Sequence, residues 1–171
     1  MRVIESNPCE NGKGAGGYSP AKAYRWLASI VAALVALDQA TKLIALRFLE
    51  PYGTISTPLG GLLRFTLVFN DGAAFGILSG RRWLMLAITV ATVLAAVLFW
   101  KGIWSMGLLV RGAAAVVLAG SLGNFIDRVR IGHVIDFIEV PLVPLFQVFN
   151  FADAFLVLGS LVLIYAIFRA S

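Results

Sequence analysis

Long runs of apolar residues limit what this chain can fold into more than any other feature of its sequence. The segment from Trp83 to Trp100 contains no charged side chain, and three further runs of similar length carry one or two charges each. A hydrocarbon core about 30 Å thick is spanned by about 20 apolar residues in a helix. Hydrophobic residues make up 60% of the chain and charged residues only 13%, which is unlike a water-soluble domain. The sequence therefore predicts an integral membrane protein.

We expect four transmembrane helices in an all-α membrane protein, with one single domain over residues 21–171. A cleaved secretory signal would place its apolar core nearer the start of the chain, so we do not expect one. The tail at residues 1–20 is rich in Gly, Asn, Ser and Pro, which predicts disorder. The expected helices are Trp26 to Leu46, Trp83 to Trp100, Met106 to Ile126 and Val148 to Phe168.

The cysteine, histidine and charge content exclude several other classes of protein. Cys9 is the single cysteine, so no intrachain disulfide forms, and no cluster of Cys and His suggests a metal; we expect no cofactor. We assign the net charge of +5 to lipid headgroups rather than to nucleic acid. An even number of spans places both termini on one side. The 14 Lys and Arg then divide equally between the two sides, so charge counting leaves the orientation open.

Carboxylates, in contrast, gather at one face of the predicted bundle. Outside the tail, all of them lie in the half where the first and third helices end and the second and fourth begin. Ionisable groups inside a membrane are costly unless they are paired or hydrated, so their convergence predicts a shared polar cavity with a function. The carboxylates are Asp38, Glu50, Asp71, Asp127, Asp136, Glu139 and Asp153.

Helical spacing puts several polar residues of this half on common helix faces. Asp38 and Lys42 are four apart on the first helix, and Asn124 lies three and four residues before Asp127 and Arg128 on the third. A simpler explanation is that Asp38 with Lys42, or Asp127 with Arg128, forms a charge pair that only fixes helix packing. These sets alone therefore do not establish a catalytic site.

Two further carboxylates have no cation next to them in the sequence. Asp136 lies in the mostly apolar loop after the third helix, and Asp153 lies with Asn150 in the first turns of the fourth. Neutralisation by a local partner does not explain them, so we interpret Asp136 and Asp153 as functional.

The connections between the helices also carry structure. The β-branched and aromatic residues from Arg64 to Asn70, followed by Asp71 and Gly72, predict a turn and a small β-element that is extracytoplasmic or interfacial. Gly72 and Gly76 would let the backbone approach a ligand closely, although a simple turn needs the same glycines. After the third helix, the segment 133–141 is expected to form a short strand or to lie at the interface.

Five short motifs, in order along residues 25–168, together resemble the signal peptidase II family, the bacterial lipoprotein signal peptidases, which are intramembrane aspartic proteases. Gly76 stands where Ser is frequent in that family, and the tail before Tyr18 is longer than usual. The motifs are Asp38-Gln39-x-x-Lys42, Asn70-x-Gly72-Ala73-Ala74-Phe75, Gly123-Asn124-x-x-Asp127-Arg128, Val134-Ile135-Asp136-Phe137 and Phe149-Asn150-x-Ala152-Asp153.

The resemblance implies that Asp136 and Asp153 are the catalytic pair of an aspartic endopeptidase. It implies as substrate a diacylglyceryl-modified prolipoprotein, which is cut just before its lipid-bearing cysteine to release the signal peptide. It also implies the bacterial inner membrane, with the site near the outer face and both termini cytoplasmic. We expect a monomer whose partners, besides the substrate, are membrane lipids. The residues that the resemblance implies for substrate binding or site support are Asn70, Gly72, Asn124, Asp127, Arg128, Asn150, Asp38 and Lys42.

Peptide hydrolysis by two close carboxylates needs no metal, because one protonated group polarises the carbonyl while the ionised one activates water. A serine protease is disfavoured because His133 is the one histidine and no Gly-x-Ser-Gly motif is present. The main alternative from another class is a small proton-coupled transporter that uses Asp38, Asp136 and Asp153 to carry protons. No inverted repeat supports that alternative. A purely structural membrane subunit would leave the aspartates unexplained.

Overall fold

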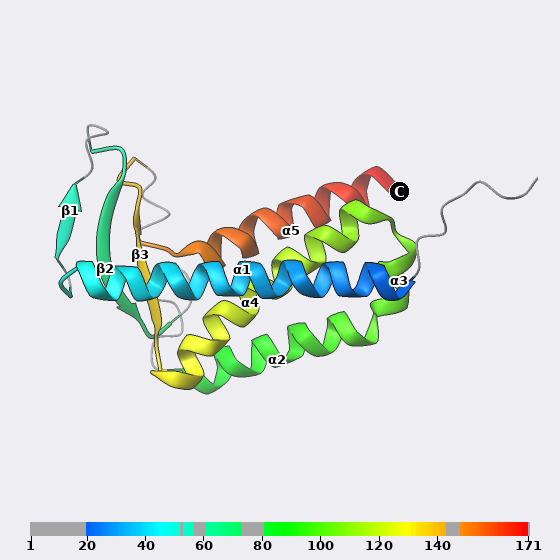
Figure 1. Ribbon diagram of the computed structural model, residues 1–171, viewed down its shortest axis with the longest axis horizontal. Helices are drawn as coiled ribbons and strands as arrows, with labels where there is room; N and C mark the ends of the chain where they lie inside the picture. Colours follow the sequence, from blue (N-terminus) through cyan, green and yellow to red (C-terminus); the bar gives the residue numbers. More distant parts are fainter. Residues whose placement is uncertain (1–19, 52, 57–60, 73–80, 143–147, 171) are drawn as a thin grey trace, which may run out of the picture.

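A computed structural model describes residues 20–51, 53–56, 61–72, 81–142 and 148–170. Helices run side by side, and a small sheet covers one end of them (Figure 1). The tail that is predicted to be disordered lies outside these described residues, apart from residue 20. Residues 73–75 of the second motif, and Gly76, also lie outside them. The elements are α1 (Pro20–Phe48), β1 (Thr54–Ser56), β2 (Arg64–Asn70), α2 (Arg82–Leu98), α3 (Trp100–Ser105), α4 (Leu108–Arg130), β3 (Val134–Glu139) and α5 (Phe151–Ala170).

Three of the described helices, α1, α4 and α5, are long and apolar enough to cross a membrane. This confirms a mostly helical membrane protein with a small β-element. The helix α2 has 17 residues and lies alongside the others (Figure 1), and its crossing of the membrane stays a prediction. Where the sequence suggested a helix from Met106, α4 begins at Leu108, because Gly107 takes a φ of 92° between α3 and α4.

The helix α4 is the centre of the bundle and packs against α1, α2 and, most extensively, α5. Glycines make the contact with α5 close. A Cβ atom at Gly120 would collide with the Ala152 carbonyl oxygen, and one at Gly159 would lie 2.8 Å from Val117 Cγ2. Small residues let membrane helices approach closely, where van der Waals contact replaces the hydrophobic effect. The end of α4 is thereby held against the beginning of α5.

The sheet has the antiparallel order β1-β2-β3. Asn70 at the end of β2 pairs with Val134 at the start of β3, and Val68 pairs with Asp136. A further bridge joins Ile138 of β3 to Phe149, directly before α5. The strand β3 therefore lies between β2 and the beginning of α5.

The first four residues of β3 are buried, and the last two are partly exposed. Val134, Ile135, Asp136 and Phe137 are all buried, and Asp136 is only 1% exposed. Three of these residues are apolar, as expected for a strand that is covered on both faces. One carboxylate among them is the exception that points to a site.

Candidate active site

The first turn of α5 holds Asp153 through a reciprocal pair of hydrogen bonds. Asn150 Oδ1 accepts from the backbone N–H of Asp153 at 2.9 Å, and Asp153 Oδ2 accepts from the backbone N–H of Asn150 at 3.3 Å. This is the arrangement of a capping box, with Asn as the N-cap and Asp at the third helical position. The Asp153 carboxylate consequently lies at the positive end of the α5 dipole.

The side-chain amide of Asn150 connects this turn to β3. Its Nδ2 donates to Asp136 Oδ1 at 2.6 Å. The other carboxylate oxygen of Asp136, Oδ2, accepts from Asn70 Nδ2 at 2.9 Å. Asn150 hydrogen bonds to both Asp136 and Asp153. The two aspartates predicted from the sequence therefore lie on either side of one residue, although they belong to different elements, β3 and α5.

The strand position of Asp136 has an electrostatic consequence. Burial, and next the charge of Asp153, raise the pKa of Asp136 to about 7, while the hydrogen bonds from Asn70 and Asn150 and the charge of Lys42 act in the opposite direction. Burial dominates because desolvation penalises the charged form. A carboxyl group with a pKa near neutrality can hold or release a proton under physiological conditions.

The helix α1 contributes a buried cation to the site. Lys42 is 1% exposed, and its Nζ lies 2.9 Å from Asp38 Oδ2 and 2.8 Å from Asp127 Oδ2. The local pair of Asp38 with Lys42 therefore exists, but Lys42 also connects α1 to α4. The carboxylate of Asp127 contacts Lys42 and Gln39 of α1, while its charge also acts on Arg128.

The orientation of Asn124 follows from this ion cluster. Its Oδ1 accepts from Lys42 Nζ at 3.1 Å and from Asn150 Nδ2 at 3.2 Å. With the oxygen occupied by two donors, Nδ2 points the other way and donates to Asp153 Oδ1 at 2.7 Å. Lys42 thus acts on Asp153 through Asn124.

Asp38 anchors the beginning of α5. Its Oδ1 accepts from the backbone N–H of Ala152 at 3.0 Å, a donor that has no partner within the helix. Gly123 of α4 makes room for this contact, because a Cβ atom there would lie 2.5 Å from Asp38 Oδ2. The helices α1, α4 and α5 are therefore in contact with one another next to the turn that holds Asp153.

Arg128 and Gly72 connect α4 to the end of β2. Arg128 Nη2 donates to the carbonyl oxygen of Gly72 at 2.8 Å, and the N–H of Gly72 donates to Asn70 Oδ1 at 2.9 Å. Arg128 therefore holds the backbone just beyond the end of β2. Since its Oδ1 is occupied by Gly72, Asn70 turns its amide nitrogen toward Asp136.

One residue of the network was not among the predicted site residues. Gln39 Nε2 contacts Asp127 Oδ1 at 3.0 Å and the carbonyl oxygen of Gly123 at 3.2 Å. A polar side chain inside an otherwise apolar helix was the available signal for Gln39. His133 packs against the ring of Phe69 at a centroid distance of 4.7 Å. Among the described residues, no group of three or more His, Cys, Asp and Glu is arranged to hold a metal ion.

Three membrane-capable helices with two aspartates joined through Asn150 beneath a small sheet define a multi-pass membrane enzyme, and solved structures agree. A 2.3 Å structure of a bacterial membrane enzyme superposes with a TM-score of 0.79 at 34% identity, covering 85% of this chain and 88% of that one. A second, described in the same words at 1.9 Å, gives 0.77 at 33% identity, with 86% and 95% covered.

The family is given by the sequence comparisons. The family model described as signal peptidase (SPase) II matches residues 30–169. The lipoprotein signal peptidase of Caldanaerobacter subterraneus is 41% identical over 137 residues, 80% of this chain and 91% of that protein. The lipoprotein signal peptidase of Mycobacterium leprae is 35% identical, with 85% and 72% covered. The chain belongs to the signal peptidase II family and is a bacterial-type membrane protease; the transporter alternative finds no support.

Proposed function

We propose that the chain is an intramembrane aspartic endopeptidase that removes the signal peptide from diacylglyceryl-modified prolipoproteins, cutting just before the lipid-modified cysteine. The observation that carries the assignment of its catalytic pair is the position of Asn150, which hydrogen bonds to both Asp136 and Asp153. The relatives named above as lipoprotein signal peptidases support this substrate class.

In the proposed reaction the two carboxyl groups divide the work of acid and base. Asp136, with its pKa near 7, is the protonated partner that polarises the scissile carbonyl. Asp153 stays ionised, supported by the end of the α5 dipole and by the donor from Asn124, and takes a proton from the attacking water. The proton then passes to the departing amine as the peptide bond breaks. The pair titrates as one unit, so these roles describe one microstate.

The other polar residues have supporting roles in this proposal. Asn70 and Gly72, at the end of β2, lie where the extended substrate would pass the acid pair. The remaining ones hold the carboxylates in position through the contacts described above. They are Asp38, Lys42, Asn124, Asp127, Arg128 and Asn150.

We also propose that α2 is the fourth membrane span of a single domain over residues 21–171. Its 17 residues extend about 25 Å, and Val97 and Leu98 near its end are well exposed, as lipid-facing residues are. With four spans both termini lie at one face, which we assign to the cytoplasm, and the site lies near the outer face of the bacterial inner membrane. We expect the enzyme to act as a monomer.

The experiment that tests the function follows release of the signal peptide from a diacylglyceryl-modified prolipoprotein by the protein in detergent. Wild type is expected to cut just before the lipidated cysteine, and Asp136→Asn and Asp153→Asn to lose cleavage while keeping the wild-type melting temperature. Glu139→Gln is the matched control, because Glu139 lies on the same strand and is partly exposed. Cleavage by both Asn variants at the wild-type rate would overturn the aspartic mechanism.

A further inference from the structure

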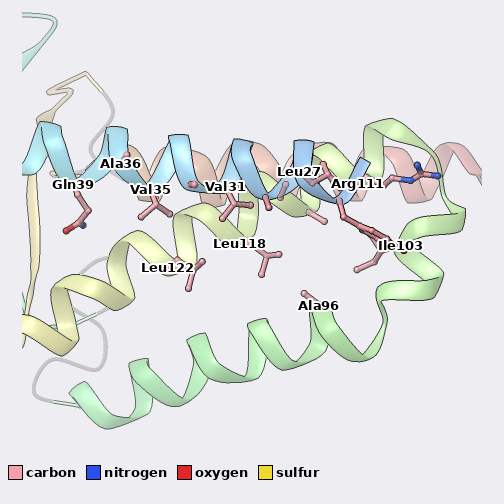
Figure 2. A pocket seen from close by; sticks show the side chains of 15 residues that line it. Leu27, Val31, Val35, Ala36, Gln39, Ala96, Ile103, Arg111, Leu118 and Leu122 are labelled. Carbon is pink, nitrogen blue, oxygen red and sulfur yellow. The ribbon is translucent and has the colours of Figure 1, made fainter. Parts of the chain in front are cut away.

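An apolar cavity of about 680 Å³ lies between α1 on one side and α2 with α3 on the other, and α4 forms its base (Figure 2). Its volume is in the range of small-molecule sites, about 300–1,000 Å³. On α1 the lining residues follow helical spacing, as Val31 and Val35 show, and on α4 so do Leu118 and Leu122. One face of α1 and one face of α4 therefore line this cavity.

The packing of the helices explains why the space is open. The helix α1 packs on α4 and α5, whereas α2 packs on α4 and α3. The side chains that α4 and α2 direct into the space include Ala96, Ala114 and Ala115, which are too small to fill it. This cavity is separate from the acid pair, since neither Asp136 nor Asp153 is among its lining residues.

The two ends of the cavity differ in polarity. Gln39 lines the end nearer the sheet, and Arg111 lines the opposite end (Figure 2). Tyr24, at the start of α1, also lines that opposite end. The helical rise places Tyr24 and Gln39 about 22 Å apart along α1. The cavity is thus a long apolar space with a cation at the end remote from the acid pair.

The charge of that remote end is positive. Arg25 at the start of α1, Arg111 near the start of α4 and Arg169 at the end of α5 lie there. Every carboxylate among the described residues lies toward the sheet instead, from Asp38 onward along α1 and around the turn of Asp153. An occupant with an apolar chain and an anionic head would match both features of the cavity.

We propose that one anionic glycerophospholipid occupies this cavity, with an acyl chain along α1 and its headgroup phosphate at Arg111. The apolar helix of a signal peptide fits less well, and this comparison rests on the proposed function. Because cleavage follows the apolar segment, the basic region at the start of a signal peptide would lie at the remote end. Arg25 and Arg111 would repel it.

The bound lipid connects two helices that the protein itself leaves apart. Its acyl chain contacts α1 and α2 together, so it fixes the position of α2 on α4. A ligand that binds only the folded state raises stability by mass action. The melting temperature of the protein in detergent therefore rises when the lipid is added.

Native mass spectrometry of the purified full chain, after incubation with phosphatidylglycerol or phosphatidylcholine, tests the proposal. Wild type is expected to retain one phosphatidylglycerol and to retain phosphatidylcholine more weakly. Arg111→Ala lowers phosphatidylglycerol retention about fivefold, the effect of one cation near a membrane surface, and Arg111→Lys restores it. Ala32→Phe fills the cavity and lowers retention of both lipids.

Ala33→Phe is the matched control, because Ala33 is the next residue on α1, is exposed, and does not line the cavity. It is expected to retain lipid as wild type does. Equal retention by wild type, Arg111→Ala and Ala32→Phe would overturn the proposal. If Ala32→Phe raises KM for the prolipoprotein and leaves lipid retention unchanged, the cavity takes the signal peptide instead. Lipid retention is read without any cleavage, so failure of the proposed function leaves this test intact.

Discussion

The two sides of α4 are built in opposite ways. Toward α5 the helices touch through glycines, and the hydrogen bond from Asn124 to Asp153 joins them at the end of the contact. Toward α1 and α2, small apolar side chains leave a long cavity. The difference lies in what fixes the side chains. Around Asp136 and Asp153, contacts within the protein fix their positions, whereas protein side chains do not fill the cavity and lipid can complete the packing there.

Removing the buried cation Lys42 from the polar end of the bundle should have the largest effect on stability and cleavage. Lys42→Met leaves Asp38 and Asp127 buried without their partner, and breaking such a pair costs about 3–5 kcal/mol. We expect a large fall in melting temperature and loss of cleavage. Arg47→Met, on the same helix but exposed, should change neither. A Lys42→Met protein that melts as wild type does would show that the cluster is not required for the fold.

The next largest effect should fall on catalysis. Asn150→Ala removes the donor to Asp136 and the N-cap acceptor of the Asp153 turn. Hydrogen bonds to charged groups contribute about 1.5–3 kcal/mol each, so we expect kcat to fall about 10- to 100-fold with a smaller change in KM. Kinetics with the lipidated substrate measure this. An unchanged kcat would show that catalysis does not depend on the hydrogen bonds of Asn150. The main observation for assigning Asp136 and Asp153 as the catalytic pair would then be lost.

The sequence motifs could predict both aspartates but not the contacts that hold them. Helical spacing correctly placed Asp38 with Lys42, and Asp153 in the first turns of its helix, because those relations are local. The pairing of Asp127 with Lys42 depends on how α1 and α4 are rotated against each other, and spacing along one helix says nothing about that rotation. For the same reason the contact of Gln39 with Asp127 could not be predicted, although Gln39 belongs to the first motif. The cavity between α1 and α2 has no sequence signature beyond small residues.

The close contact itself can be tested with a smaller change. Gly123→Ala puts a Cβ atom 2.5 Å from Asp38 Oδ2 and 3.0 Å from Ala152 Cβ, and such overpacking costs about 1–3 kcal/mol. We expect a lower melting temperature and a lower kcat. Gly112→Ala is the matched control, because nothing lies within 4 Å of a Cβ there on the same helix. Equal melting temperatures for the two variants would mean that Asp38 and Ala152 can shift at little cost in stability to make room for a Cβ atom at position 123.

The smallest expected effect is a shift in the pH profile. Asn70 lowers the pKa of Asp136 by hydrogen bonding to its carboxylate, so Asn70→Leu should raise that pKa further from its ordinary value. Since the proposed acid must be protonated, cleavage declines as pH rises through the pKa of Asp136. The declining limb should therefore move to higher pH in the variant, by about one pH unit for about 1.4 kcal/mol. A shift to lower pH would contradict the role of Asp136 as the acid.

The order in which the site is completed follows from the place of Asp153 near the end of the chain. Until α5 is inserted, Asp38 lacks the amide of Ala152, and Asn124 and Asp136 lack Asn150 and the second carboxylate. Unsatisfied polar groups are costly in a bilayer. We therefore expect a nascent chain to be inactive and less stable until α5 has been inserted.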